Sequence, residues 1–325
     1  MFAAKDLLFS RPTGYQLTRS LRFRRSATAY LSRTMGTPTS QNIWTYSVWV
    51  KRGLLGLSAV NSDNGLLHGG ATSASHYMEF TTGDALQFIE TTGPNAGFTT
   101  TQLFRDPSAW YHIVVAVSSS ATGTDKIKVY VNGNQVTSFS YDARSSWSSS
   151  PINQSGQINY IGLAYSTSYT LDGYLGEVNF IDGQQLTPAS FGQTNPITGV
   201  WESIKYTGTY GTNGFYLPFN IPSNAGKDAS GNNNNWTLSG FNTSTANSTY
   251  DIVSDVPTQW TPRASTTDIG GNQTVDLTYS VQVGGANDNA NGIFMSGSYT
   301  TGPAMSLDTL NSFYKLGTGK NYWTI

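Results

Sequence analysis

The chain contains no cysteine among its 325 residues, which excludes disulfide bonds and metal sites built from thiolates. It contains only three histidines, His68, His76 and His112, and no two of them stand at the spacing of a helical zinc-binding pair. No stretch approaches the roughly 18 apolar residues of a membrane-spanning helix. The apolar run near the start is short and interrupted by charges, unlike a signal-peptide core. We therefore expect no membrane span, no thiolate metal site and no classical secretory signal.

Charged residues are also scarce, at 11% of the chain against roughly 25% in an average soluble domain. Serine, threonine, asparagine and glycine take their place, and these residues favour turns and short strands over long helices. Hydrophobic residues make up 38% of the chain and aromatic residues 13%, enough to bury a sizeable core. The composition therefore predicts an all-β protein with many short strands.

The few charges are unevenly distributed. Up to Met35, seven basic residues stand against one acidic residue, a net charge of +6, while the remaining 11 basic and 18 acidic residues give −7. We interpret residues 1–20 as an arm that, with the arginines just after it, anchors the protein to an acidic partner protein. The anchoring arginines are Arg11, Arg19, Arg22, Arg24 and Arg25. The alternative to an anchoring arm is a first strand with one solvent-exposed, arginine-rich face. Nucleic acid is not favoured as a partner, because Phe23 is the only aromatic residue among the clustered arginines from Arg19 to Arg25.

The clearest strands lie at residues 110–117 and 126–131. Apolar side chains alternate in both, which predicts one face on the core and places His112 on the other, outward face. Asn132-Gly133 follows the second strand directly, and Asn-Gly after an alternating run predicts a two-residue hairpin, because both turn residues must accept positive φ. Residues 135–139 are expected to return as the partner strand.

Further strand candidates follow one another at short intervals, separated by Gly, Asn and Ser. They lie at residues 20–23, 29–33, 44–50, 77–80, 85–90, 158–164, 174–181 and 214–219. This spacing is typical of a β-sandwich or jelly roll. A Pro-containing segment at 255–263 indicates a boundary. We therefore predict the sandwich over residues 21–256 and a small β-rich unit over residues 257–325, with a short helix at 306–317.

Several strings in the sandwich region resemble a known family. WYHIVVAV, followed by KIKVYVNGNQV, is similar to the laminin-G/concanavalin A-like jelly roll, in which a Trp-led strand precedes a strand that ends in Tyr-x-Asn-Gly. Residues 171–188 are similar to a later strand of that fold. There Leu175, Glu177 and Val178 match, and Gly176 stands where the family often has aspartate. The resemblance implies a concanavalin A-like (laminin-G-like) jelly roll sandwich.

A more specific resemblance covers about residues 15–257. The strings SLRF…AYLSRT, WTYSVWVKRG, DGQQLTPASFG, YTGTYGTNGFYLPF and DASGNNNNWT resemble concanavalin A-like proteins encoded by marine and cyanobacterial tailed phages. This implies a virion protein, displayed on the capsid or tail as a fibre, spike or decoration, that attaches to host surface glycans and contacts other virion proteins through its arm. By analogy with phage fibres we expect a homo-oligomer, with a trimer favoured. The alternative is a purely architectural capsid or tail decoration protein without a ligand.

An enzyme of this fold is the less favoured alternative. A glucanase needs two acidic residues close together, and the Glu-x-Asp-x-x-Glu pattern of such enzymes does not occur in the sequence. The nearest pair, Glu177 with Asp182, is separated by five residues, which puts the two on opposite faces of a continuous strand. The isolated histidines give no zinc site or catalytic triad. We therefore predict a binding or structural protein without enzymatic activity.

The resemblance also raises calcium as a cofactor, because jelly rolls of this class often use it to shape a sugar site with oxygen ligands from loops. The candidate ligands are Asp63 in one Asx-rich stretch and Asp228, Asn232 and Asn234 in another. Each stretch has a single carboxylate, and Asx turns explain the composition equally well. We therefore expect no cofactor, with calcium as the alternative.

Sugar binding generally uses exposed aromatic residues beside polar groups, since an aromatic face covers the apolar side of a pyranose while amides and carboxylates fix its hydroxyls. Trp147 lies in the Ser-rich string SSWSSS, and Tyr165 and Tyr169 lie in a polar loop. We predict these three as candidate glycan-binding residues. Subunit contacts in a trimer would use the same exposed aromatics, and aromatics in such loops can also cover the core, so these alternatives stay open.

Overall fold

The structure is a computed structural model. It describes residues 15, 17, 19–56, 63–70, 75–91, 96–196, 198–221, 224–241, 252–253, 275–276 and 280–281. The chain divides into two units, Met1–Gln259 and Trp260–Ile325. This division lies close to the predicted boundary after residue 256, which stays a prediction. The predicted helix at 306–317 and most of the arm lie outside the described residues.

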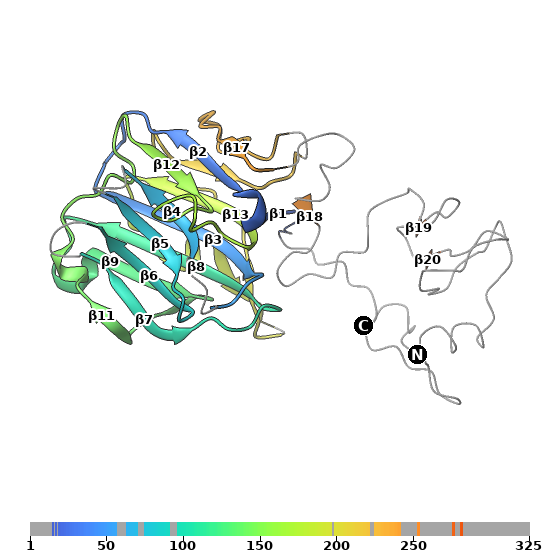
Figure 1. Cartoon of the computed structure of the whole chain (residues 1–325), viewed down its shortest axis with the longest axis horizontal. Coiled ribbons are helices and arrows are strands. Elements are labelled where there is room, and N and C mark those ends of the chain that lie inside the picture. Colours follow the sequence, from blue (N-terminus) through green and yellow to red (C-terminus); the bar gives the residue numbers. More distant parts are fainter. Residues whose placement is uncertain are drawn as a thin grey trace, which may run out of the picture. The chain divides into compact units, whose positions relative to one another are not determined.

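Within the described part of the first unit, the strands form two antiparallel sheets of eight strands each. The first sheet contains, in spatial order, β10 (Asn134–Gln135), β9 (Ile127–Val131), β8 (Trp110–Ser118), β3 (Ile43–Arg52), β13 (Gly173–Asp182), β1 (Ser20–Phe23) and β18 (Ile252–Val253), with β16 (Phe215–Leu217) also paired to β13. The second contains β11 (Phe139–Asp142), β7 (Phe98–Leu103), β6 (Ala85–Glu90), β5 (His76–Phe80), β4 (Asn64–Gly69), β12 (Ile158–Ile161), β2 (Tyr30–Thr34) and β17 (Thr237–Ser239). Figure 1 shows the two sheets stacked as a sandwich, so the prediction of an all-β jelly roll is confirmed.

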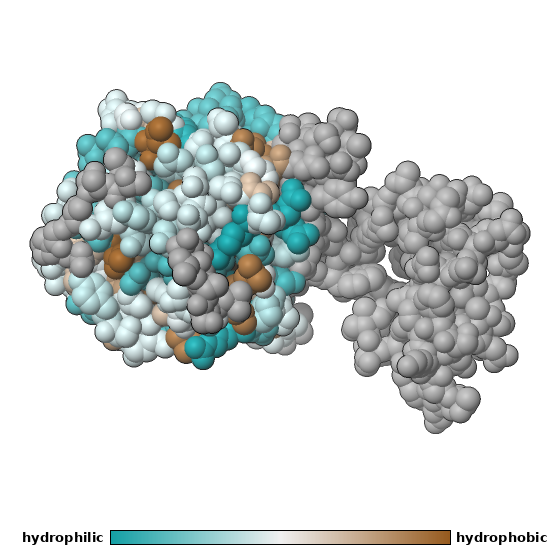
Figure 2. Space-filling model, in the orientation of Figure 1, coloured by the Kyte–Doolittle hydropathy of each residue, from teal (hydrophilic) through white to brown (hydrophobic). Residues whose placement is uncertain are grey.

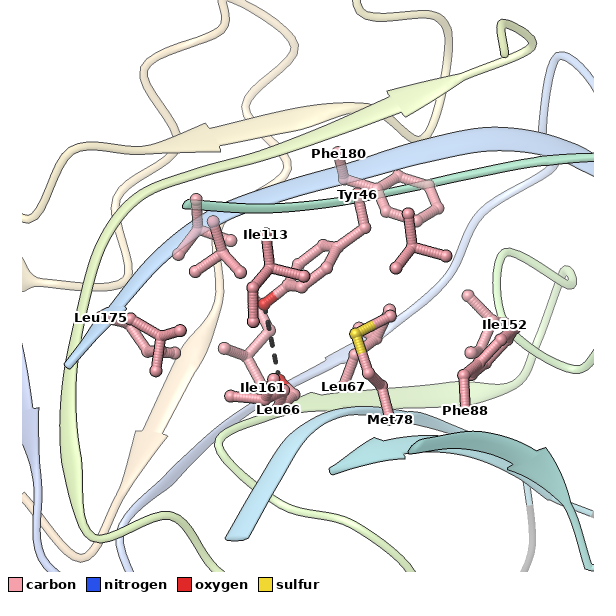
Figure 3. Packing of buried hydrophobic residues seen from close by; sticks show 14 of the residues in the cluster. Tyr46, Leu66, Leu67, Met78, Phe88, Ile113, Ile152, Ile161, Leu175 and Phe180 are labelled. Atoms are coloured by element: carbon pink, nitrogen blue, oxygen red, sulfur yellow. Dashed lines mark hydrogen bonds between the residues drawn. The ribbon is translucent and has the colours of Figure 1, made fainter. Parts of the chain in front are cut away.

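The core lies between the two sheets, where the inward-facing residues of each strand meet. Tyr46 and Phe180 from the first sheet approach Leu67 and Met78 from the second (Figure 3). The Tyr46 hydroxyl donates a hydrogen bond to the Leu66 carbonyl oxygen at 3.5 Å, which satisfies a polar group in the middle of the core. The alternation predicted for residues 110–117 is confirmed, because the β8 side chains at 113, 115 and 117 belong to the core between the sheets, whereas Val114 packs in a separate cluster.

The Asn-Gly hairpin is confirmed at its turn and corrected in its return strand. Asn132 and Gly133 have φ angles of 48° and 80°, the left-handed conformations that this two-residue turn requires. β9 pairs with β10 across the turn, with Val131 opposite Asn134. The pairing ends at Gln135, however, and Phe139 begins β11 in the other sheet. The segment after the turn therefore crosses from one sheet to the other.

The remaining described elements are short. The first unit contains one further hairpin, β14 (Gly192–Thr194) with β15 (Trp201–Ser203), and the 3-10 turns η2 (Arg25–Ala27), η3 (Gly123–Lys126), η4 (Arg144–Ser146) and η5 (Pro188–Ser190). In the second unit, β19 (Val275–Asp276) pairs with β20 (Ser280–Val281). In the part of the chain that the structure describes, no helix has the length and apolar character needed to span a membrane.

Candidate functional site

The outer face of the first sheet is covered by the chain that follows β13. Trp201 in β15 donates a hydrogen bond through Nε1 to His112 Nδ1 at 2.9 Å, and His112 Nε2 lies 2.9 Å from Ser47 Oγ. The imidazole also stacks on Trp49, with ring centroids 4.8 Å apart. His112 is only 1% exposed, and burial lowers its pKa to about 3. His112 therefore lies on the predicted outer face of its strand, but it is buried there, because a hairpin from later in the chain covers that face.

The outer face of the second sheet carries a row of aromatic side chains. Tyr77 in β5 lies opposite His68 in β4, and His68 lies opposite Tyr160 in β12, so strand pairing aligns the three across the sheet. His68 stacks on Tyr160 with ring centroids 5.2 Å apart. Tyr165, in the loop after β12, continues the row, with its ring centroid 6.1 Å from that of Tyr77 and 6.2 Å from that of Tyr169. We refer to these five residues as the tyrosine face.

Two of the three predicted glycan-binding residues belong to the tyrosine face. Tyr165 is 38% exposed and Tyr169 is half-buried. Their loop is held in shape by backbone hydrogen bonds from Tyr169 to Ser166 at 2.9 Å and from Ala164 to Tyr169 at 3.0 Å. In Figure 2 the described surface is mostly white to teal and its brown patches are small and separate. The described part of the surface in that view is therefore mostly neutral to hydrophilic.

Two carboxyl groups lie beside the tyrosines. Glu79 follows Tyr77 by two residues, on the same face of β5. Burial, and then the negative charge of Asp63, raise the pKa of Glu79 to about 8, so its carboxyl is largely protonated at neutral pH. Asp63 also has a raised pKa, because burial outweighs a hydrogen bond from the Thr82 backbone and the charge of Arg25. Glu79 is only 5% exposed and Asp63 is half-buried, so Asp63 is the more accessible of the two carboxyls beside the aromatic rings.

Tyr77, His68 and Glu79 were missed as site residues by the sequence analysis. The signal that could have found them is the alternation in HYMEF, where Met78 and Phe80 are buried in the core and Tyr77 and Glu79 take the opposite face. The pattern could not show that Tyr165 from a separate loop lies against Tyr77, because that contact depends on how β12 pairs with β4.

Trp147 does not belong to this site, and its prediction as an exposed glycan-binding residue is wrong. The side chain is 0% exposed. Its ring centroid lies 6.1 Å from that of Trp44, 5.5 Å from that of Phe88 and 5.0 Å from that of His76. The serines next to it, at positions 145, 146, 148 and 149, are exposed, whereas the indole turns inward into the core. For Trp147 the structure thus supports the alternative stated from the sequence, an aromatic residue that covers the core.

The first of the predicted anchoring arginines lie before and within β1. Arg11 is outside the described residues, and Arg19 is half-buried just before the strand. Arg22 is exposed in β1, with its guanidinium carbon 5.9 Å from the ring centroid of Tyr174. Arg22 therefore lies on the solvent-exposed face of a strand of the sandwich, where a partner can reach it.

Arg24 and Arg25 are also part of the sandwich, at the start of η2, and both are half-buried. Arg25 donates hydrogen bonds from Nε to the Thr170 carbonyl oxygen at 3.1 Å and from Nη2 to the Asp63 carbonyl oxygen at 2.5 Å. The Arg25 guanidinium thus ties two loops of its own domain together, and its predicted role as an anchor for a partner stays a prediction.

The predicted calcium ligands around Asp228 are held in hydrogen bonds. Its Oδ1 accepts from the backbone nitrogens of Tyr216 and Ser230 at 2.9 and 2.8 Å, and its Oδ2 accepts from Ser230 Oγ and the Asn234 backbone nitrogen at 2.8 Å each. The side-chain amides of Asn232 and Asn234 donate to carbonyl oxygens at residues 211, 212 and 214. In the described residues no three His, Cys, Asp or Glu side chains gather as a metal site would require. The loop is therefore built as an Asx-turn network.

The acidic pair considered for catalysis does not form a shared groove. Asp182 accepts hydrogen bonds from the backbone nitrogens of Thr39, Ser40 and Asn213 and from Asn153 Nδ2, at distances of 2.6 to 3.1 Å. Glu177 has a separate set of partners, the hydroxyls of Tyr15 and Tyr216. Each carboxyl is occupied by its own neighbours, so this geometry does not supply the acid and base of a glycoside hydrolase.

The fold and these sites can be compared with known proteins. A family model described as the concanavalin A-like lectin/glucanases superfamily matches residues 25–190, about half of the chain. No curated protein is similar enough to match. Among solved structures, a heptameric SAP-like pentraxin from Limulus polyphemus has 12% identity and a TM-score of 0.36, over 54% of this chain and 80% of that chain.

Two further solved structures have similar values. Domains LG4-5 of the mouse laminin alpha1 chain have 12% identity and a TM-score of 0.35, over 60% of this chain and 48% of that chain. The CBM40 of the Ruminococcus gnavus IT-sialidase has 10% identity and a TM-score of 0.37, over 54% of this chain and 96% of that chain. This chain thus spans about half of the laminin fragment. By the family model, which covers strands of both sheets, this chain belongs to the concanavalin A-like lectin/glucanase superfamily.

Proposed function

We propose that this protein binds glycans through the tyrosine face. The observation that carries the proposal is the partly exposed ring of Tyr165 beside Tyr77 and Tyr169, with the Glu79 and Asp63 carboxyls next to them. An aromatic ring covers the apolar side of a sugar, and carboxyl oxygens hold its hydroxyls. The superfamily includes lectins, which is consistent with a binding role.

We further propose that the protein is a structural component of a tailed-phage virion, displayed on the capsid or tail. The support is the set of phage-like strings that run through the sandwich. Many weak glycan sites on a symmetric particle, in a homo-oligomer such as a trimer, would give strong attachment through avidity. Since Arg25 is used inside the domain, the anchor would consist of residues 1–20 together with the exposed Arg22.

Replacing Tyr165 and Tyr169 together with alanine is expected to weaken glycan binding by about tenfold or more, because two stacking rings are lost. The full-length protein and the variant would be compared on an array of bacterial surface oligosaccharides. The matched control is Tyr141→Ala, since Tyr141 is 39% exposed but lies in β11, three strands away from β5 in the same sheet. Equal glycan binding by Tyr165→Ala/Tyr169→Ala and wild type would contradict the assignment of the site.

The same variant separates glycan binding from the architectural alternative. If the tyrosines form subunit contacts, Tyr165→Ala/Tyr169→Ala changes the oligomeric state in light scattering, and wild type binds no glycan. The virion location is tested by immunogold labelling of intact particles with antibodies against the sandwich and against the arm. Sandwich label on the outer surface with an inaccessible arm is the expected result, and particles without label would overturn the virion proposal.

A further inference from the structure

A row of cationic and aromatic side chains crosses the outer face of the first sheet. Strand pairing puts Arg22 in β1 opposite Tyr174 in β13. Tyr174 in turn lies opposite Lys51 in β3, and Lys51 lies opposite Trp110 in β8. Residues paired across antiparallel strands point to the same side of a sheet, and the residues next to these in β1, β3 and β13 are buried in the core. We refer to these four residues as the cation–aromatic row.

The side chains of the row contact one another across the strands. The ring centroids of Trp110 and Tyr174 are 6.4 Å apart, although β3 lies between their two strands. The guanidinium carbon of Arg22 lies 5.9 Å from the ring centroid of Tyr174, within the range of a cation–π contact. Tryptophan, tyrosine and arginine are the residue types that most often dominate the binding energy of protein–protein interfaces. The row therefore forms one continuous patch with the composition of an interface centre.

The chain covers the neighbouring part of the same face and leaves the row accessible. Trp49 and His112 lie on that face two residues away along β3 and β8, and they are 2% and 1% exposed beneath Trp201. Arg22, in contrast, is exposed, and the other three members of the row are partly exposed. A partner can therefore reach the row without displacing any part of the fold.

The charge of the row defines the chemistry of the partner. Among the described residues, no carboxylate lies within ion-pair distance of Arg22. Near Lys51 lies Asp106, whose pKa is lowered first by hydrogen bonds from Ser108 and in smaller part by the Lys51 charge. Arg22 therefore presents a positive charge that its own domain does not compensate, next to two aromatic rings. Since complementary potentials steer and select partners, this charge favours an acidic partner.

The root of the N-terminal arm lies on the same face of the first sheet. Leu17 is 2% exposed and is buried against Trp49, and Trp110 of the row packs against this pair. The hydroxyl of Tyr15 donates a hydrogen bond to Glu177 at 2.8 Å, which fixes Tyr15 to β13. The segment predicted to anchor the protein therefore meets the sandwich beside the cation–aromatic row.

We propose that the cation–aromatic row binds an acidic surface of a partner protein and, together with the root of the arm, forms one docking face. The identity of the partner rests on the proposed virion role, whereas its acidic chemistry follows from the row itself. The tyrosine face lies on the outer side of the other sheet. Docking at the row therefore leaves the tyrosine face free on the opposite side of the sandwich, where it can meet a glycan.

The chemistry of the partner is tested on the full-length protein with poly-L-glutamate as the probe. We expect binding that weakens with added salt and that is about fivefold or more weaker in Arg22→Ala/Lys51→Ala. The matched control Lys128→Ala/Lys227→Ala removes the same charge from β9 and from the chain between β16 and β17, and it should bind like wild type. The proposal is overturned if wild type does not bind, or if both double variants bind equally well. It is also overturned if polygalacturonate or oligothymidylate binds more tightly, because the row would then take an acidic glycan or a nucleic acid.

The docking face is tested by hydroxyl-radical footprinting of the free protein and of intact particles. We expect Trp110 and Tyr174 to lose reactivity in the particles while Tyr165 keeps it. The docking face is overturned if Trp110 and Tyr174 stay as reactive as in the free protein, or if Tyr165 is protected to the same extent. Particles without the protein overturn the virion proposal, and the poly-L-glutamate comparison then still decides whether the row takes an acidic partner. The two proposals can therefore fail separately.

Discussion

Trp147→Ala is expected to lower the free energy of unfolding by about 3–5 kcal/mol. The indole is fully buried and packs against Trp44, Phe88 and His76, with a T-shaped contact to Trp44 at 79° between the ring planes. Since Trp44 belongs to the first sheet and Phe88 and His76 to the second, loss of the indole is expected to leave a cavity that borders both sheets. Urea unfolding followed by far-ultraviolet circular dichroism measures the effect without relying on tryptophan fluorescence.

The control for this prediction is Tyr165→Ala, which removes an aromatic from the same predicted set but at a partly exposed position. We expect it to change the free energy of unfolding by less than about 1 kcal/mol. The two variants thus separate a core residue from a surface residue. A Trp147→Ala protein as stable as wild type, with reduced glycan binding, would show that Trp147 acts at the surface and would contradict its assignment to the core.

Glu177 is expected to make the protein less stable as the pH rises. It lies at an irregularity of β13 between the pairings at Gly176 and Asn179, with φ of 48°, which turns its side chain out of the regular alternation. Its Oε1 accepts hydrogen bonds from the hydroxyls of Tyr15 at 2.8 Å and Tyr216 at 2.6 Å. Burial is the main cause that raises its pKa from 4.5 to about 7, against the two hydrogen bonds and the charge of Lys205.

The sign of the effect follows from the higher pKa in the folded state. Between about pH 4.5 and 7 the unfolded chain has lost the Glu177 proton while the folded protein keeps it. The stabilising contribution of the protonated Glu177 is therefore fully present below about pH 4.5. It is lost progressively as the pH rises from there through the folded-state pKa of about 7. By pH 8 the loss is on the order of 3 kcal/mol.

Glu177→Gln keeps the shape of the side chain and removes its ionisation. The free energy of unfolding of the variant minus that of wild type should therefore increase by on the order of 3 kcal/mol as the pH rises from 4.5 to 8. Chemical denaturation of both proteins at matched pH values measures this difference, and the other buried ionisable groups, including Glu79 and the histidines, cancel because both proteins contain them. A difference that stays constant over this pH range would contradict the prediction.

Local features of the chain were sufficient for the fold class and for several of its elements. The alternation in β8 predicts which side chains face the core between the sheets, because the pleat sends successive side chains to opposite faces whatever lies around them. Asn132-Gly133 predicts its turn because both residues tolerate the left-handed backbone that the turn needs. Tyr165 and Tyr169 were placed correctly near the surface, since they lie in a polar loop whose shape is set by its own short-range hydrogen bonds.

The remaining features depend on segments that are distant in the chain. The two-residue alternation of side chains in β8 identifies the face on which His112 lies. Its burial, however, depends on Trp201, 89 residues later in the chain, which covers that face. Trp147 stands among serines, and only the meeting of its loop with Trp44 and Phe88 brings it into the core. Local periodicity reports the direction of a side chain, whereas burial depends on what the rest of the chain places over it. The fold class therefore follows from the sequence, and which of its aromatic residues can reach a ligand follows from packing.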